Sequence, residues 1–293
     1  MQMARHMTVR NLLFIAFSVL VCIVYYGPFR DLFLLSVYYN ELYSHLVIIP
    51  FVSAYFIYLK RKEIFSNIGY SFSAGIAIII VGILLYLIGM SQGSRLNQND
   101  YLSFITFSAV ITWLGVFVFF YGIKAFKTAA FPLLFLFLLV PIPSLVIDNI
   151  ILILQRASSE VAASIFTLTG VPVLREGWFV FHLPGLSIEV AKECSGIRSS
   201  ISLFITSIIA GQMFLNSSWR KVVLTLMIFP ITIFKNGLRI VTLGLLGAYV
   251  SPEILSSNIH KKGGIPFFIL SLGFLGAILW LLKRSERKEV PHT

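Results

Sequence analysis

The sequence has few charged residues, few cysteines and no segment long enough for a sizeable soluble domain. Of its 293 residues, 12% are charged and 58% are hydrophobic, and the mean hydropathy is +0.90. Soluble domains carry about a quarter charged residues, so we expect an all-α polytopic membrane protein, organised as a single domain over residues 1–293. Its only cysteines, Cys22 and Cys194, lie far apart. This argues against a disulfide scaffold and against a cysteine-based metal site.

Several motifs of common enzyme classes are also missing. The sequence contains no G-x-S-x-G elbow, no H-E-x-x-H pair, no phosphate-binding glycine loop and no paired carboxylates at metal-ligand spacing. We therefore expect neither a metal nor a cofactor. The net charge of +11 could suggest a nucleic-acid partner. Most of the basic residues, however, lie in short loops between apolar runs, where they orient a membrane protein, so no nucleic acid is expected.

Long apolar runs predict about eight transmembrane helices, each near the length that crosses roughly 30 Å of hydrocarbon. The first is an uncleaved helix rather than a signal peptide, because no small-x-small cleavage site follows it. The predicted spans are Asn11–Tyr26, Tyr43–Leu59, Phe72–Met90, Tyr101–Tyr121, Ala129–Val146, Ile197–Leu215, Val222–Tyr249 and Ile265–Leu282.

Alternate loops differ in their Lys and Arg content, which predicts the orientation. One set is rich in basic residues and includes both termini, residues 60–62, and the Arg220-Lys221 pair. The other set is longer and poorer in them. We therefore expect both termini to be cytoplasmic, in a cytoplasmic (inner) membrane, with Cys194 on the extracytoplasmic side.

The connection from about Pro143 to Glu193 is predicted to be structured. Residues 147–170 have polar side chains toward their middle, which favours a helix lying at the interface, with a re-entrant or crossing segment as the alternative. Trp178–Leu183 and Leu186–Val190 flank a Pro-Gly turn and predict a short extracytoplasmic β-hairpin that leads to Cys194.

Cys194 precedes an apolar helix in the sequence Cys194-Ser195-Gly196-Ile197-Arg198. Unpaired N–H groups and the positive end of the helix dipole favour a thiolate at such a position, and Arg198 acts in the same direction. A cysteine that only fills apolar space is the alternative.

Polar residues interrupt the apolar run Val222–Tyr249, where an ionisable group needs a partner, a water-filled cavity or a position near the interface. Asn236 and Arg239 are three residues apart and share a helix face, with Arg239 in the outer half of the membrane. Lys235 is expected to point elsewhere and to extend toward the interface.

His260 falls in the outer loop before the last helix, on the same side as Cys194 and Arg239. The three residues predict a cysteine nucleophile with His260 as base and Arg239 as the group that holds an oxyanion. A solvated loop histidine is the alternative for His260, and for Arg239 it is pairing with Glu253 or a lipid head group. His45, at the outer end of the second span, is a further site candidate, with packing as its alternative.

These residues resemble the exosortase/archaeosortase family of polytopic membrane cysteine transpeptidases. One difference is Leu46, which follows His45 where the family often has glycine. The matching segments are Val190 to Ser199, Pro230 with Asn236-Gly237-Leu238-Arg239, His260 with Gly264 and Phe268, Phe131 to Leu136, Val140 to Pro143, Gly170 to Val173, and Tyr43-Ser44-His45.

The resemblance implies that Cys194, Arg239 and His260 are catalytic, with Ser195, Gly196, Arg198, Asn236 and His45 as supporting or substrate-binding residues. It implies exported protein substrates with a tripartite C-terminal sorting signal of the PEP-CTERM type, cleaved near the recognition motif through a thioester at the outer face of the membrane and transferred to an envelope glycan or lipid. The alternative outside the enzymes is a small transporter or channel, which would more often show repeat symmetry and breaks in its helices near the membrane midplane.

Overall fold

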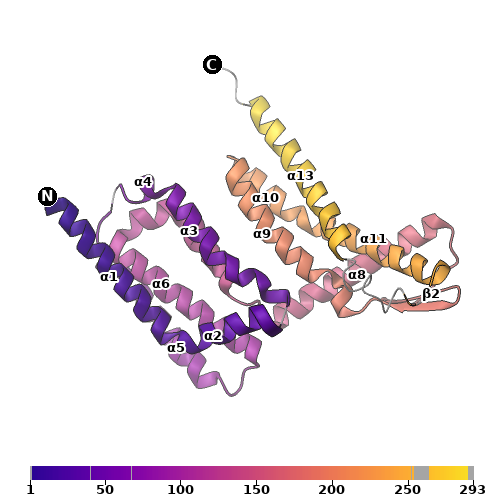
Figure 1. The fold of residues 1–293 in the computed structure, drawn as a ribbon, viewed down its shortest axis with the longest axis horizontal. Coiled ribbons are helices and arrows are strands. Elements are labelled where there is room, and N and C mark those ends of the chain that lie inside the picture. Colours follow the sequence, from indigo (N-terminus) through magenta and orange to yellow (C-terminus); the bar gives the residue numbers. More distant parts are fainter. Residues whose placement is uncertain (1, 40, 67, 252, 254–263, 290–293) are drawn as a thin grey trace. The chain divides into compact units, whose positions relative to one another are not determined.

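The computed structural model describes residues 2–39, 41–66, 68–251, 253 and 264–289. The chain divides into two compact units, Met1–Val146 and Ile147–Thr293. Both units are mainly helical, and the second also contains one small sheet (Figure 1). The predicted class, an all-α polytopic membrane protein, is confirmed.

The first unit is built around the packing of two long helices, α5 (Phe72–Gln92) and α6 (Gln98–Thr128). Three glycines seven residues apart on α5 allow this close approach, because a Cβ at Gly75, Gly82 or Gly89 would lie within 2.6 Å of an α6 side chain. The other described elements of this unit are α1 (Gln2–Val24), α2 (Tyr26–Leu34), the π-helical turn η1 (Leu35–Tyr39), the 3-10 helix η2 (Glu41–Ile48), α3 (Ile49–Leu59), α4 (Arg61–Ile64), α7 (Ala130–Phe135) and the 3-10 turn η3 (Leu136–Leu139).

The second unit contains the elements that surround Cys194. The helix α8 (Ser144–Thr169) begins at the end of the first unit and supplies most of its length to the second. Helices α9, α10 and α13 contact one another, and α11 contacts α9, α10, α13 and strand β3. The elements after α8 are β1 (Leu174–Glu176), β2 (Val180–Leu183), β3 (Leu186–Glu189), the 3-10 turn η4 (Lys192–Ser195), α9 (Ile197–Phe214), α10 (Ser218–Leu226), α11 (Ile228–Tyr249) and α13 (Gly264–Glu289).

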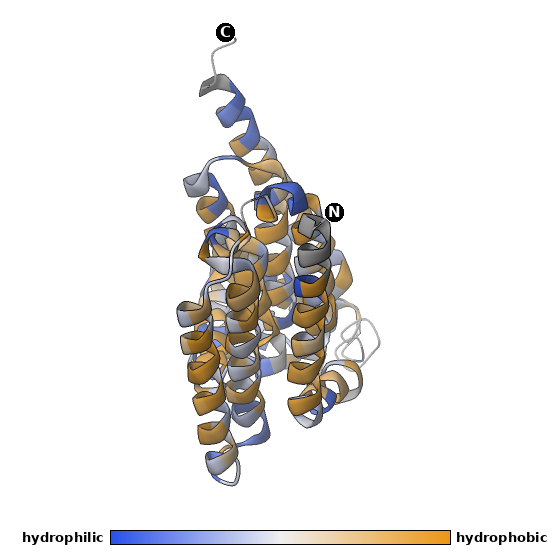
Figure 2. Ribbon diagram, turned by 90° about the vertical axis from the view of Figure 1, so that its left-hand side faces the viewer, coloured by the Kyte–Doolittle hydropathy of each residue, from blue (hydrophilic) through white to orange (hydrophobic). Residues whose placement is uncertain are grey.

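The number of candidate membrane spans agrees with the prediction. Within the described residues, seven helical segments are long and apolar enough to cross a membrane, and an eighth results if the bent pair Val9–Val24 and Tyr26–Val37 is one span. Hydrophobic residues make up most of the helices (Figure 2). On α5, side chains such as Ile76, Ile80 and Leu84 are exposed, as expected for a face in contact with lipid.

The predicted span Ala129–Val146 is wrong as a continuous helix. The chain forms α7 and the turn η3 and then becomes extended at Val140. Pro141 and Pro143 cause the break, because a proline disfavours helical backbone at the residue before it.

Helix α8 is 26 residues long and belongs to the candidate spans by length and hydropathy. A helix over residues 147–170 was predicted and is confirmed, although it begins three residues earlier. Its interfacial position stays a prediction. The helix has an amphipathic pattern, with Gln155, Ser158, Ser159, Ala162 and Phe166 on its buried side.

The predicted β-hairpin is confirmed, with a third strand that the sequence did not reveal. Strands β2 and β3 pair antiparallel around Pro184-Gly185, where Gly185 takes the positive φ of 74° that the tight turn needs. Strand β1 pairs with the outer edge of β2. The buried Phe181 and Leu183 of β2 pack in one cluster with residues of α8 and α11, so the sheet is attached to both helices.

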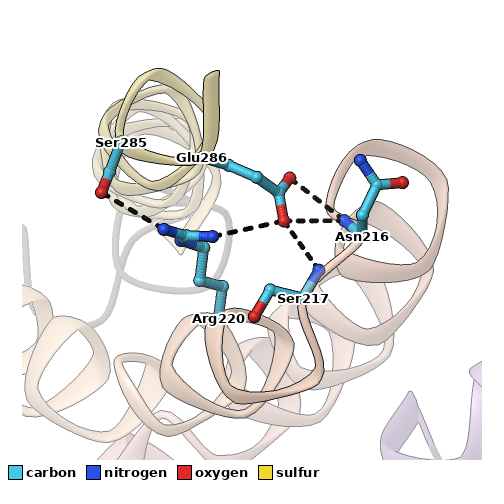
Figure 3. A network of polar contacts seen from close by, with 5 residues as sticks. All are labelled: Asn216, Ser217, Arg220, Ser285 and Glu286. Carbon is cyan, nitrogen blue, oxygen red and sulfur yellow. Dashed lines mark hydrogen bonds and ion pairs between the residues drawn. The ribbon is translucent and has the colours of Figure 1, made fainter. Parts of the chain in front are cut away.

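A carboxylate near the end of α13 secures the start of α10. Glu286 accepts hydrogen bonds from the backbone N–H groups of Asn216, at 3.1 Å, and Ser217, at 2.7 Å (Figure 3). Its Oε1 also lies 3.5 Å from Nη1 of Arg220, whose side chain is 2% exposed. A negative charge at a helix N-terminus is stabilising. Here the carboxylate also joins the C-terminal part of α13 to the start of α10.

Candidate functional site

Cys194 lies in a tight turn at the start of α9. The 3-10 turn η4 ends at Gly196, which has a φ of 78° and forms the N-cap of α9. Only glycine takes this left-handed conformation without strain. The Gly196 carbonyl accepts hydrogen bonds from the backbone of Ser200 and from the hydroxyls of Ser199 and Ser200. The predicted location of Cys194 before a helix N-terminus is confirmed for the backbone, and its side chain lies outside the described part of the chain.

The chain before this turn is fixed to the hairpin and to α8. Val190 donates its N–H to the carbonyl of Phe179 at 2.8 Å, and its own carbonyl accepts a hydrogen bond from Nε2 of Gln155. Gln155 is 6% exposed and lies in the polar section of α8. The turn is therefore anchored at Val190 on one side and at Gly196 on the other.

A polar stripe runs along α11, formed by Thr232, Lys235, Asn236 and Arg239. Their spacing of three, four and seven residues places them along one side of the helix. Thr232 and Asn236 are fully buried, Lys235 is 3% exposed, and Arg239 is half-buried. An apolar helix that buries three polar groups and half-buries a fourth on one side faces a polar interior, which is the usual setting of a functional site in a membrane protein.

The turn at Gly196 packs directly against this stripe. A Cβ at Gly196 would lie 3.2 Å from Nζ of Lys235 and 3.3 Å from Oδ1 of Asn236. Lys235 also donates a hydrogen bond from Nζ to the hydroxyl of Ser199, at 2.6 Å. The backbone beside Cys194 and the polar stripe of α11 thus belong to one site within the second unit.

The expectation for Lys235 is therefore wrong. It does not extend toward the interface but points inward to the first turn of α9. The reason is that α11 is covered on more than one side, so that neighbouring positions on the helix can both be buried. Phe234 of α11 lies against Phe274 of α13, while Gly237 lies against Val161 of α8.

The remaining predicted residues lie in different places. Ser195 is fully buried, and its hydroxyl accepts a hydrogen bond from the N–H of Ile197 at 3.4 Å. Arg198 is exposed on α9. His45 belongs to the first unit, where its Nδ1 lies 3.1 Å from the carbonyl oxygen of Leu42. His260 lies outside the described residues, so its predicted role stays a prediction, as do those of Cys194 and Arg239.

Three residues of the site were missed by the sequence reasoning: Lys235, Ser199 and Gln155. The signal for Lys235 was its spacing of four residues from Arg239, which places the two on one side of the helix. Ser199 lies in the segment Val190 to Ser199 around Cys194, but nothing in the sequence identified a residue of α11 as its partner. Among the described residues, no three His, Cys, Asp or Glu side chains lie close enough together to bind a metal ion.

The arrangement favours a negative charge near Cys194. The N-terminus of α9 provides the positive end of its helix dipole, and the Lys235 ammonium lies beside Gly196. An anionic nucleophile or an oxyanion is stabilised by such a set of donors in a water-poor site.

Comparison with protein families gives a match. Residues 36–277 match the model of the family described as transmembrane exosortase, which covers the turn at Cys194, all of α11 and most of the first unit. Comparisons with curated proteins and with solved structures give no match. A match over this share of the chain establishes membership, and the chain belongs to the transmembrane exosortase family.

Proposed function

We propose that this chain is a membrane-embedded cysteine peptidase and transpeptidase that removes C-terminal sorting signals from exported proteins. The observation that carries the proposal is the packing of Gly196 against Lys235 and Asn236. It brings the backbone beside Cys194 onto α11, and Arg239 follows Asn236 by one turn on the same helix. Membership of the exosortase family supports the same assignment.

In the proposed reaction, His260 accepts the proton of the Cys194 thiol, and the thiolate attacks the carbonyl carbon of the scissile peptide. Arg239 donates hydrogen bonds to the carbonyl oxygen while it carries the negative charge. The C–N bond then breaks, His260 returns the proton to the departing amine, and the exported protein stays on sulfur as a thioester. An amine or hydroxyl of the acceptor attacks the thioester, and its proton returns the thiolate to a thiol.

The substrate is a tail with a short recognition motif, a transmembrane helix and a basic cluster. Such a helix approaches α11 within the bilayer, while the recognition motif reaches the turn before α9. This orientation requires Cys194 on the extracytoplasmic side and both termini in the cytoplasm of a cell with a cytoplasmic membrane. The acceptor is an envelope glycan or lipid.

The test is to express the full chain with a tailed substrate in membranes and to follow tail removal by gel mobility and mass spectrometry. We expect Cys194→Ala to abolish processing, Arg239→Ala and His260→Ala to reduce it by about 10² or more, and wild type to release the tail. The matched controls are Cys22→Ala in the first helix and His182→Ala in the hairpin, both of which should process normally. His182 suits this purpose because it is partly exposed and hydrogen-bonded to Ser187 and Glu176, on the sheet rather than on α11.

Processing that survives the loss of Cys194 contradicts the proposal. A trapped thioester supports it further: a small amine nucleophile added to the wild type should appear on the new C-terminus of the product, and none should appear with Cys194→Ala.

A further inference from the structure

Lys235 is a buried cation with a single hydroxyl as its side-chain partner. It is 3% exposed, and its Nζ donates to Oγ of Ser199 at 2.6 Å. Within the described part of the chain, no Asp or Glu oxygen lies within ion-pair distance of it. A buried ammonium is costly unless a negative charge is present beside it, and a neutral hydroxyl does not provide that charge.

The direction of the side chain indicates where the negative charge belongs. Nζ of Lys235 lies 3.2 Å from the point where a Cβ on Gly196 would be, and Gly196 is two residues from Cys194. Ser199 holds Nζ in place and donates its own hydrogen bond to the Gly196 carbonyl at 2.8 Å. Lys235, Ser199 and Gly196 therefore form a connected path from α11 to the turn that carries Cys194.

Among the charged side chains near the turn that the structure describes, none supplies an anion to Lys235. Arg239 lies one turn after Lys235 on α11, and two cations at this spacing repel each other. Arg198 of α9 is exposed, and Glu189 at the end of β3 is also exposed. Lys192 and Glu193 belong to the turn itself. Of the groups in the turn, the Cys194 thiol is the one whose ionisation is tied to the proposed reaction.

We propose that Lys235 is a positioning residue that stabilises the thiolate form of Cys194, with Ser199 holding its ammonium against the turn. The inference rests on the proposed function for the role of Cys194. The two cations of α11 then have different roles. Lys235 stabilises the thiolate before attack, and Arg239 stabilises the oxyanion that forms afterwards. The glycine at 196 is part of this device, because any side chain there would meet the ammonium.

The test measures the thiolate directly, without a substrate. In a Cys22→Ser background, Cys194 is the only thiol, and the full chain in detergent or nanodiscs is alkylated with iodoacetamide over a range of pH. We expect Lys235→Met to raise the pH midpoint of alkylation by about one unit or more, since an opposite charge within a few ångströms shifts such midpoints by one to three units. Lys235→Arg should keep the midpoint close to that of the parent, and Ser199→Ala should raise it by a smaller amount.

The matched control is Lys221→Met. Like Lys235, Lys221 lies on a membrane helix and donates a hydrogen bond from Nζ to a neutral group, Oε1 of Gln212, at 2.8 Å. It lies on α10 rather than on α11. It should leave the midpoint unchanged. If Lys235→Met unfolds the chain, Ser199→Ala decides the question, because it keeps the Lys235 ammonium and removes only the hydroxyl that holds it; an unchanged midpoint in that variant then overturns the inference.

An unchanged midpoint in both Lys235→Met and Ser199→Ala overturns the inference, even if Cys194→Ala abolishes processing. Conversely, a raised midpoint combined with normal processing in Cys194→Ala overturns the proposed function and leaves the electrostatic pairing intact. The two failures are therefore distinguishable by separate readouts.

Discussion

Gly237 lets α11 pack directly on α8, and we predict that a single methyl group there will destabilise the second unit. A Cβ at Gly237 would lie 2.6 Å from Cγ1 and 2.9 Å from Cβ of Val161, and 3.2 Å from the backbone nitrogen of Ala162. Carbon atoms at optimal separation are about 3.5–4.0 Å apart. Gly237→Ala therefore forces the two helices apart by about 1 Å, because a branched side chain and a backbone atom cannot turn away.

The expected size follows from this geometry. Overpacking of a well-packed interior costs about 1–3 kcal/mol, and the gain in helix propensity from Gly to Ala returns up to about 1 kcal/mol. We expect a net loss near 1–2 kcal/mol, which corresponds to a fall in Tm of several degrees for a chain of this size. Asn236 lies next to Gly237 and Arg239 follows two positions later, so a displacement of about 1 Å should also reduce processing by about 10².

The assay is thermal unfolding of the full chain in detergent, followed by intrinsic fluorescence, with the processing assay on the same variants. Gly244→Ala should cost less, because its Cβ would meet the movable side-chain ends of Ile188, at 3.0 Å, and Phe166, at 3.1 Å. Gly273→Ala is the matched control: no atom of the described structure lies within 4 Å of its Cβ position, so its Tm should stay the same or rise slightly. Adding Val161→Ala to Gly237→Ala should recover part of the loss.

The reasoning is refuted if Gly237→Ala has the same Tm as Gly273→Ala, since both exchange the same residue types on membrane helices. A loss that Val161→Ala does not reduce would equally contradict the steric explanation.

Two further predictions concern carboxylates that hold the ends of helices. Glu286→Ala removes the acceptor for the N–H groups of Asn216 and Ser217 and should cost about 2–3 kcal/mol, while Glu286→Gln should cost about 1 kcal/mol because one acceptor oxygen stays; both are measured by Tm in detergent. Asp100→Ala removes the 2.6 Å hydrogen bond from the N–H of Ser144 at the start of α8 and should cost about 1–2 kcal/mol, and Asp100→Asn should recover most of it. If either alanine variant unfolds at the parent's Tm, the corresponding carboxylate does not contribute to stability.

The membrane helices were predictable because their signal is local. A run of about 20 apolar residues must satisfy its backbone hydrogen bonds within itself, so composition alone identifies α5 and α9 to within a few residues and the start of α13, whose charged last turns extend beyond the predicted span. The hairpin was predictable for a similar reason, since Pro184-Gly185 between two β-prone segments specifies a tight turn.

The errors arose where two local signals compete or where the partner is distant in sequence. The apolar content of residues 129–146 favoured one span, but the helix ends before Pro141 and Pro143. A proline disfavours helical backbone at the residue before it, whatever the hydropathy of the segment. The strand β1 is three residues long and gains its order from pairing with β2, so its own sequence carries little signal.

Lys235 shows why the site could be predicted only in part. Hydropathy identified α11 as a span with unusual polar residues, and the spacing of Asn236 and Arg239 correctly placed two of them on one side. Which sides of α11 are buried depends on how many other elements pack against it, and the sequence of the helix does not specify that number. The partner of Lys235, Ser199, is 36 residues away in sequence and on another helix.

The packing of α11 explains why stability and chemistry depend on the same helix in this protein. Its glycines Gly237 and Gly244, seven residues apart, face α8 and the hairpin, while Lys235 reaches α9. The buried polar side chains of α11, Thr232, Lys235 and Asn236, cannot reach water or lipid head groups, so they must be compensated from inside the unit. The short contacts at the glycines bring α11 close enough for that compensation to come from the turn at Gly196. Any change that moves α11 away from α8 should therefore weaken the polar site as well as the fold, whereas changes on the lipid-exposed side of α13 should affect neither.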